Sequence, residues 1–215
     1  MIITIDGPAG SGKSTVARKL AARLEVAYLD TGAMYRAVAY AGLLRQTDLS
    51  SEAACGALVR ALRIELDFGP TYARIRVDGH DVSEAIRTIR VSAATSEVAR
   101  HPAVRTFLVK MQRSEGDRLK SFVTEGRDQG SVVFPNADVK FVLNASAEKR
   151  AERRLQQLLV DGEDVTLEQV RENITQRDSI DAIQWQSLLE PGAAHIIDTT
   201  TMSISEVLDR LMEHV

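Results

Sequence analysis

Five short apolar segments, rich in β-branched residues, recur along the chain and predict buried parallel strands. They are Ile2–Ile5, Val26–Leu29, Phe122–Thr124, Val139–Leu143 and His195–Ile197. Continuous apolar runs of this length are typical of strands that are covered on both faces, as in parallel sheets packed between helices. We therefore expect an α/β fold with a five-stranded parallel sheet flanked by helices.

Apolar residues at helical spacing separate these strands. In Lys13–Leu24 the apolar side chains recur every three or four residues, which predicts an amphipathic helix directly after the first strand. Three later segments show the same pattern: Ser146–Val160, Thr166–Asp181 and Ser203–Met212. Two of them start with sequences typical of capping boxes, Thr166-x-x-Gln169 and Ser203-x-x-Glu206.

A different pattern interrupts this alternation in the middle of the chain. Leu62–Phe68 and Arg74–Asp78 alternate apolar and polar residues, with Gly69-Pro70 between them and Gly79-His80 after them as turn signals. The pattern predicts a small antiparallel sheet.

Two helical segments follow this sheet, near Ile89–Ala99 and Pro102–Glu115. We expect residues 62–115 to form a subdomain inserted into a single unit, whose core consists of residues 1–61 and 116–215.

Composition narrows the class of protein. A chain of 215 residues with 44% hydrophobic and 27% charged residues is ordinary for one globular α/β domain. The single cysteine, Cys55, excludes a disulfide framework. The apolar run Ala37–Leu44 is too short to cross a membrane, and Met1–Asp6 lacks the basic start of a signal peptide. We expect a cytoplasmic protein without a membrane partner.

The charge balance points to small anions rather than nucleic acid. The net charge is −3, so no overall field attracts a polyanion, and we expect no nucleic-acid partner. Arginine nevertheless far outnumbers lysine among the 27 basic residues. Its planar guanidinium suits bidentate recognition of phosphate, although base composition of the genome gives an alternative explanation.

The segment after the first strand has the pattern G-x-x-x-x-G-K-[ST], here Gly7-Pro8-Ala9-Gly10-Ser11-Gly12-Lys13-Ser14. Its glycines let the loop curl so that backbone N–H groups face phosphate oxygens, and the following helix adds its positive end. Lys13 supplies a charge near the transferring phosphate, and the Ser14 hydroxyl suits Mg²⁺. The strand before the loop and the helix after it match the context that this motif requires.

The loop predicts a nucleoside triphosphate site but leaves the phosphate acceptor open. GTPases, ATPase motors and small-molecule kinases share it. A nucleotide-dependent switch is therefore one alternative, although the chain contains no Asn-Lys-x-Asp motif for reading guanine.

A kinase with a phosphorylated acceptor needs cations for a second anion, and arginines occur in four further segments. Arg36 lies about one turn into the helix after the second strand, where Thr31 is a candidate cap. Arg127-Asp128 stands between glycines after the third strand, at the strand end where ligands bind in such sheets. Each segment also has a purely structural alternative: a solvated arginine for the first and an ion-paired turn for the second.

The remaining arginines lie on two predicted helices. Arg150, Arg153 and Arg154 are spaced to share one helix face, and Arg177 and Asp181 are spaced i, i+4. A solvated charged face and a surface ion pair are the alternatives to a phosphate site.

These residues together resemble the bacterial-type cytidylate kinases, within the nucleoside monophosphate kinases. The resemblance covers nearly the whole chain. It rests on the segments Ile5–Thr15, Tyr28–Arg36, Asp81–Thr88, Glu125–Pro135 and Ala145–Arg154. The Gly-Arg-Asp-x-Gly sequence and the inserted sheet are specific to that family, whereas the phosphate loop is widespread.

The resemblance implies a P-loop fold, ATP with Mg²⁺, a monophosphate region enlarged by the insert, and a mobile lid over residues 150–164. The ATP phosphates are expected at Gly7, Pro8, Ala9, Gly10, Ser11, Gly12, Lys13, Ser14 and Thr15, with Ser14 as the metal ligand. The acceptor is expected at Thr31, Tyr35, Arg36, Ser96, Arg105, Arg127, Asp128, Arg177 and Asp181. Lys13, Arg127, Arg150 and Arg154 are the expected catalytic residues.

The chain departs from the family pattern at three places. Gln184 stands where the family usually has an arginine, and Ser187-Leu188-Leu189 replaces Ala-Pro-Leu. Gln129 replaces a common methionine, and we expect that change to be mild.

The implied reaction is transfer of the γ-phosphoryl group of ATP to CMP or dCMP by a monomeric enzyme. A kinase for UMP or another small acceptor is the nearest alternative. Asp128 is expected to accept a hydrogen bond from the cytosine amino group, and Arg105 to donate one to the base.

Overall fold

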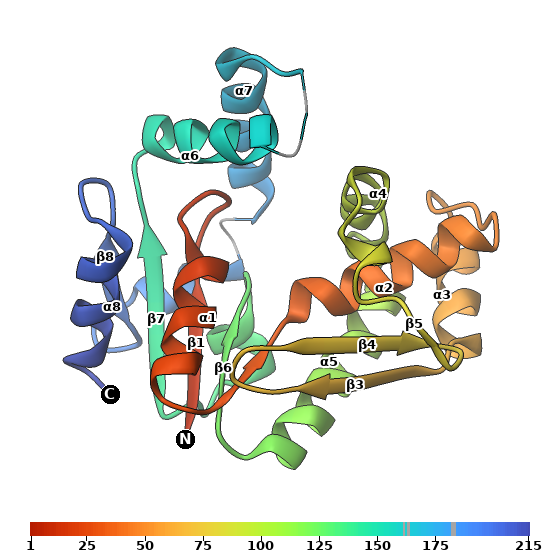
Figure 1. The fold of residues 1–215 in the computed structure, drawn as a ribbon, viewed down its shortest axis with the longest axis horizontal. Helices are drawn as coiled ribbons and strands as arrows, with labels where there is room; N and C mark the ends of the chain where they lie inside the picture. The colour runs from red at the N-terminus through yellow and green to blue at the C-terminus, as the bar shows by residue number, and fades with distance from the viewer. Residues whose placement is uncertain (161, 163, 182–183) are drawn as a thin grey trace. The chain divides into compact units, whose positions relative to one another are not determined.

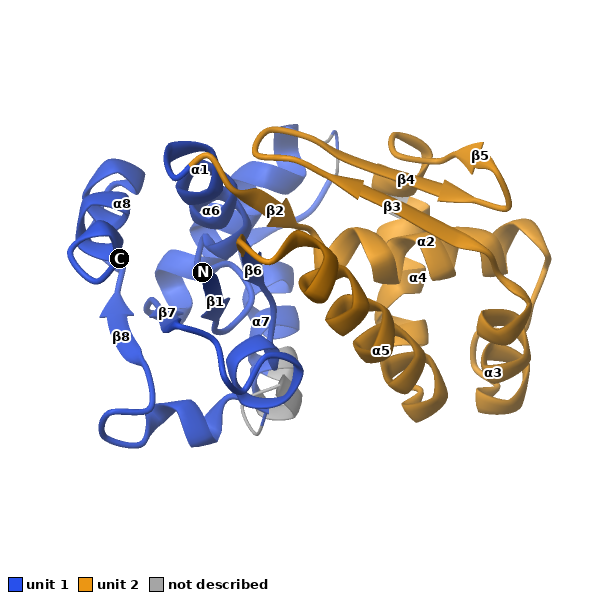
Figure 2. Ribbon diagram, turned by 90° about the horizontal axis from the view of Figure 1, so that it is seen from below, with its two compact units in different colours: residues 1–24, 123–215 blue, residues 25–122 orange. Residues whose placement is uncertain are grey.

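The computed structural model describes residues 1–160, 162, 164–181 and 184–215. Their internal contacts divide the chain into two compact units (Figure 2). Unit 1 comprises residues 1–24 and 123–215, and unit 2 comprises residues 25–122. Unit 2 begins and ends outside the predicted insert 62–115, whose boundaries remain a prediction.

The predicted five-stranded parallel sheet is confirmed, with strand order β2-β6-β1-β7-β8 (Figure 1). Its strands are β1 (Ile2–Asp6), β2 (Ala27–Leu29), β6 (Phe122–Glu125), β7 (Val139–Asn144) and β8 (His195–Asp198). β1 and β7 pair in parallel with Ile3 opposite Val139, and β7 and β8 pair in parallel with Phe141 opposite His195. Most side chains of the first four strands are buried, Ile3, Ile5 and Phe141 completely, as expected for a sheet covered on both faces. The edge strand β8 buries only Ile197.

The helices of unit 1 occur where the amphipathic pattern predicts them. They are α1 (Lys13–Arg23), α6 (Ala147–Val160), α7 (Leu167–Asp181) and α8 (Ile204–Met212), with short turns of helix at η2 (Gln129–Val133) and η4 (Gln186–Leu189). Both capping boxes form; at the start of α8, Ser203 Oγ accepts from Glu206 N while Glu206 accepts from Ser203 N. α6 packs on α7 through Ala151 and Ile174.

Unit 2 combines helices with a small antiparallel sheet. Its helices are α2 (Thr31–Leu44), α3 (Glu52–Ala61), η1 (Ala85–Arg87), α4 (Ile89–Ala99) and α5 (Pro102–Leu119), and its second sheet has the order β3 (Ile64–Phe68), β4 (Ala73–Val77), β5 (His80–Asp81). α2 packs against α4 and α3 packs against α5. Two strands of this sheet are as predicted; β5 was not, because a strand of two residues after a turn has no alternation to detect.

One predicted cap is wrong. Asp30, rather than Thr31, caps α2: its carboxylate accepts a hydrogen bond from Ala33 N at 2.8 Å, and Thr31 is already the first helical residue. An aspartate before the first turn is an equally good cap and also carries the charge that the helix N-terminus favours.

No helix among the described residues is both long and apolar enough to cross a bilayer.

Candidate functional site

The phosphate loop connects β1 to α1, as the motif requires, and two glycines explain its backbone. Gly7 has φ 139°, and a Cβ at this position would lie 2.1 Å from the Leu143 carbonyl oxygen of β7. Gly12, at the start of α1, has the left-handed φ of 89°. Any other residue would be strained at both positions, so the path of the loop requires glycine at 7 and at 12.

Lys13 is the first residue of α1, and its side chain turns back into the loop. It is 5% exposed, and its ammonium donates to the Pro8 carbonyl at 2.6 Å and to Ser11 Oγ at 3.4 Å. The cation is therefore held inside the loop, at the positive end of a helix of 11 residues. This arrangement suits a polyphosphate.

Ser14 contacts a carboxylate from a distant part of the chain. Its hydroxyl donates to Glu125 Oε1 at 2.9 Å, and Glu125, the last residue of β6, is 9% exposed. A hydroxyl and a carboxylate together are oxygen ligands of the kind that Mg²⁺ prefers. The donor set therefore fits the predicted metal.

Sequence reasoning gave Glu125 no role. The signal was present, because an acidic residue directly follows a buried strand at the end of the sheet where ligands bind.

Arg127 and Asp128 lie in the turn after β6, and this turn is tied to β1. Gly126 N donates to the Ile5 carbonyl at 3.0 Å. The Asp6 carboxylate accepts from Gln129 N at 2.8 Å and from Gly130 N at 2.7 Å. Since Asp6 directly precedes Gly7, one buried carboxylate links the start of the phosphate loop to the predicted acceptor-binding turn.

Burial raises the pKa of Asp6 to about 6, because the fully buried carboxylate loses its hydration. The two backbone N–H groups oppose that rise, the nearby Asp128 charge adds to it, and Lys13 lowers it.

This shift makes a prediction for stability against pH. A carboxyl whose folded pKa is raised from 3.8 to about 6 binds its proton more tightly in the folded state. Its contribution to the free energy of unfolding is therefore present below pH 4 and is lost as pH rises through 6. Relative to Asp6→Asn, wild type should lose up to about 3 kcal/mol of stability between pH 4 and pH 7, measured by urea unfolding.

Asp198→Asn provides a control of opposite sign. Hydrogen bonds from Thr200 lower the pKa of the exposed Asp198, so its contribution is lost as pH falls. Parallel stability curves for wild type and Asp6→Asn would contradict the prediction for Asp6.

The arginines of α6 contact different partners. Arg150 is 5% exposed; its guanidinium donates to the Ala145 carbonyl at 2.9 Å, to the Ala9 carbonyl at 3.2 Å and to both oxygens of Asp178 at 3.0 and 2.6 Å. It thereby joins the phosphate loop, the start of α6 and helix α7. A contact between residues 9 and 150 is not readable from helical spacing.

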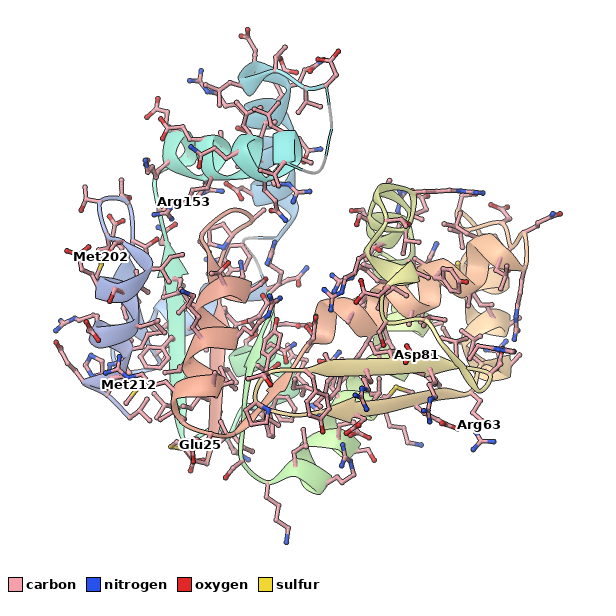
Figure 3. The ribbon with its side chains drawn as sticks, viewed as in Figure 1. Glu25, Arg63, Asp81, Arg153, Met202 and Met212 are labelled. Atoms are coloured by element: carbon pink, nitrogen blue, oxygen red, sulfur yellow. The ribbon has the colours of Figure 1, made fainter. Side chains whose placement is uncertain are left out.

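Arg153 and Arg154 are half-buried. Arg153, labelled in Figure 3, donates to Thr199 Oγ1 at 3.0 Å and to the Thr199 carbonyl at 2.6 Å, after β8. Arg154 donates to Gln157 Oε1 at 2.9 Å. The three arginines thus share a helix, but their guanidinium groups serve three different contacts.

Arg177 and Asp181 lie in the last turns of α7. Their side chains are outside the part of the chain that the structure describes. Gln184 is described, and its carbonyl accepts a hydrogen bond from Ser131 Oγ at 2.7 Å.

In unit 2, the predicted acceptor residues lie on three helices. Thr31, Tyr35 and Arg36 lie on α2, Ser96 lies on the neighbouring α4, and Arg105 lies on α5. Ser96 is exposed and Arg105 is half-buried.

The guanidinium of Arg36 is only partly satisfied by hydrogen bonds. Its Nη2 lies 3.3 Å from Asp30 Oδ2, while its buried Nε has no hydrogen-bond partner among the residues that the structure describes. A buried donor without a partner costs about 1–3 kcal/mol, so a ligand oxygen at this position would be stabilised.

The chain is similar over nearly its whole length to proteins of known family. The family model described as cytidylate kinase matches residues 3–215. The cytidylate kinase of Geobacillus kaustophilus is 45% identical over 217 residues, covering 99% of this chain and 95% of that protein. The cytidylate kinase of Bacillus subtilis is 43% identical over 214 residues, again covering 99% and 95%.

Among solved structures, an uncharacterized protein from Eubacterium ventriosum aligns over 100% of this chain and 97% of that one, with a TM-score of 0.54 and 14% identity. At that identity the likeness concerns the fold alone.

Proposed function

Because this chain belongs to the cytidylate kinase family, we propose that it transfers the γ-phosphoryl group of ATP to the phosphate of CMP or dCMP. The products are ADP and CDP or dCDP. The observation that carries the proposal is the loop between β1 and α1, with the Lys13 ammonium held inside it and the Ser14 hydroxyl on Glu125. Phosphoryl transfer requires positioning and charge neutralisation rather than a side-chain nucleophile, and this loop supplies both.

The loop residues 7–15 would hold the ATP phosphates. Lys13 would stabilise the charge on the transferring group, and Arg154 would do so from α6. Arg150 was predicted as a catalytic residue; its contact with the Ala9 carbonyl favours a role in bracing the loop. When bound, Mg²⁺ would add Lewis-acid neutralisation of the phosphates, held by Ser14 and Glu125.

The acceptor would be bound by the arginines outside the loop. Arg36, Arg127 and Arg177 would orient the acceptor phosphate for in-line attack. Thr31, Tyr35, Ser96, Arg105, Asp128 and Asp181 would contact the rest of the nucleotide. Asp128 is an acceptor for the cytosine amino group and would repel the carbonyl that uracil presents in its place.

An assay of ADP release with ATP, Mg²⁺ and each of CMP, dCMP, UMP, AMP and GMP tests the proposal. We expect strong preference for CMP and dCMP. Comparable turnover of UMP would indicate that the departure at Gln184 relaxes base choice. ATP binding without acceptor-dependent turnover would favour a nucleotide-dependent switch instead.

The metal proposal has its own test. Glu125→Gln keeps the shape and the hydrogen bond to Ser14 but removes the charge. We expect about tenfold more Mg²⁺ for half-maximal rate at fixed ATP and CMP, because one charged oxygen ligand is lost.

Glu115→Gln is the matched control, since Glu115 pairs with Arg118 on the surface of α5. An unchanged Mg²⁺ dependence in Glu125→Gln would remove this carboxylate from the metal site.

A further inference from the structure

Gln129 is a buried amide at a position where the family usually has a methionine. Its side chain is 2% exposed, and it opens the short helix η2 after β6. A buried amide without hydrogen bonds costs about 1–3 kcal/mol more than an apolar side chain of the same length. A glutamine is therefore favoured at this position only if its amide oxygen and amide nitrogen both form hydrogen bonds.

Both ends of the amide are engaged. Thr124 Oγ1 donates to Gln129 Oε1 at 3.1 Å, and Gln129 Nε2 donates to Asp128 Oδ1 at 3.4 Å. A hydroxyl can donate or accept, whereas a carboxylate oxygen accepts, so it is the Asp128 contact that fixes the amide with its NH₂ group toward Asp128.

The backbone of Gln129 is fixed as well. Its N–H donates to the buried Asp6 carboxylate at 2.8 Å. The side chain folds back over Gly126, where a Cβ would lie 2.9 Å from Gln129 Cγ. Gln129 thus packs against the turn that carries Arg127 and Asp128, and it occupies the space that a side chain at position 126 would need.

The contact with Gln129 restricts the orientation of the Asp128 carboxylate. A carboxylate held through one oxygen cannot rotate without losing that bond. The Asp128 charge lies close enough to Asp6 to raise the pKa of that buried carboxyl, so the turn keeps two carboxylates near each other. The Gln129 NH₂ group supplies a donor to one of them, Asp128.

We propose that Gln129 is a positioning residue. It holds the Asp128 carboxylate where it can accept a hydrogen bond from the amino group of cytosine, and so sharpens the choice of CMP over UMP. This inference rests on the proposed function, since Asp128 must contact the acceptor. It departs from the expectation that the replacement of methionine at this position is mild.

Gln129→Met is the primary test, because methionine has similar length and flexibility without the amide. We expect KM for CMP to rise about fivefold, KM for ATP to stay within twofold, and the ratio of kcat/KM for CMP to that for UMP to fall about fivefold. Gln129→Glu keeps the oxygen toward Thr124 but places a second carboxylate beside Asp128. It should raise KM for CMP more than Gln129→Met does.

A double-mutant cycle with Asp128→Ala separates positioning from packing. If Gln129 acts through Asp128, Gln129→Met changes KM for CMP by less than twofold in the Asp128→Ala background. A fivefold effect that persists in that background would overturn the proposal, as would an unchanged ratio of CMP to UMP in Gln129→Met.

The same cycle separates the role of Asp128 in binding CMP from the role of Gln129 in positioning Asp128. If Asp128→Ala leaves KM for CMP unchanged while wild type phosphorylates CMP, the assignment of Asp128 fails and this proposal with it. If Asp128→Ala raises KM for CMP and neither Gln129 variant does, only this proposal fails. Thermal unfolding of each variant confirms that it is folded at the assay temperature.

Discussion

Replacing Lys13 with alanine is expected to lower kcat for CMP about a thousandfold or more, because one preorganised cation at the transferring phosphate is removed. Lys13 suits this role through its position, since its ammonium is held within the phosphate loop by the Pro8 carbonyl and Ser11 Oγ. No other residue of the loop carries a positive charge. Steady-state turnover with saturating ATP and CMP measures the loss.

Lys19→Ala is the matched control for this prediction. Lys19 is an exposed lysine on the same helix, α1, so its removal should leave kcat within twofold. Circular dichroism should show the same helix content in both variants, because the Lys13 ammonium donates to Pro8 and Ser11 of the phosphate loop, which lie outside the helix. Turnover of Lys13→Ala close to wild type would exclude Lys13 from the chemistry.

The strands and the phosphate loop could be predicted because their determinants are local. A buried parallel strand is a continuous apolar run, and the loop is eight consecutive residues with a strand before it and a helix after it. The same holds for the capping boxes at Thr166 and Ser203, whose partners are three residues away.

The parts that sequence reasoning missed depend on contacts between distant residues. Ser14 and Glu125 are 111 residues apart, and Arg150 and Ala9 are 141 apart, so nothing in either segment alone reveals the pair. Gln129 is similar: its type is visible in the sequence, but the burial that gives its amide meaning arises only when β6 and β1 lie side by side in the sheet. The cap at Asp30 was a different kind of error, a choice between two adjacent residues of similar capping strength.

The second large effect is expected at Arg127, in the turn after β6. Arg127→Ala should lower kcat/KM for CMP about a hundredfold, because a guanidinium bound to a phosphate contributes hydrogen bonds to a charged group that alanine cannot replace. KM for ATP should change by less than threefold, since the ATP phosphates are assigned to the loop around Lys13. The position is prepared for this role: Gly126 N is bonded to Ile5 and Asp6 holds the residues that follow, so Arg127 starts from a fixed backbone.

Arg127→Lys separates charge from shape at the same position. Lysine keeps the charge but not the planar fork, so it should restore only part of the lost kcat/KM for CMP. Arg118→Ala removes an exposed arginine that pairs with Glu115 on α5, and it should change neither KM. If Arg127→Ala weakened ATP and CMP equally, the turn would support the site as a whole. A loss for CMP alone would assign Arg127 to the CMP site, because ATP and CMP would then depend on different cations.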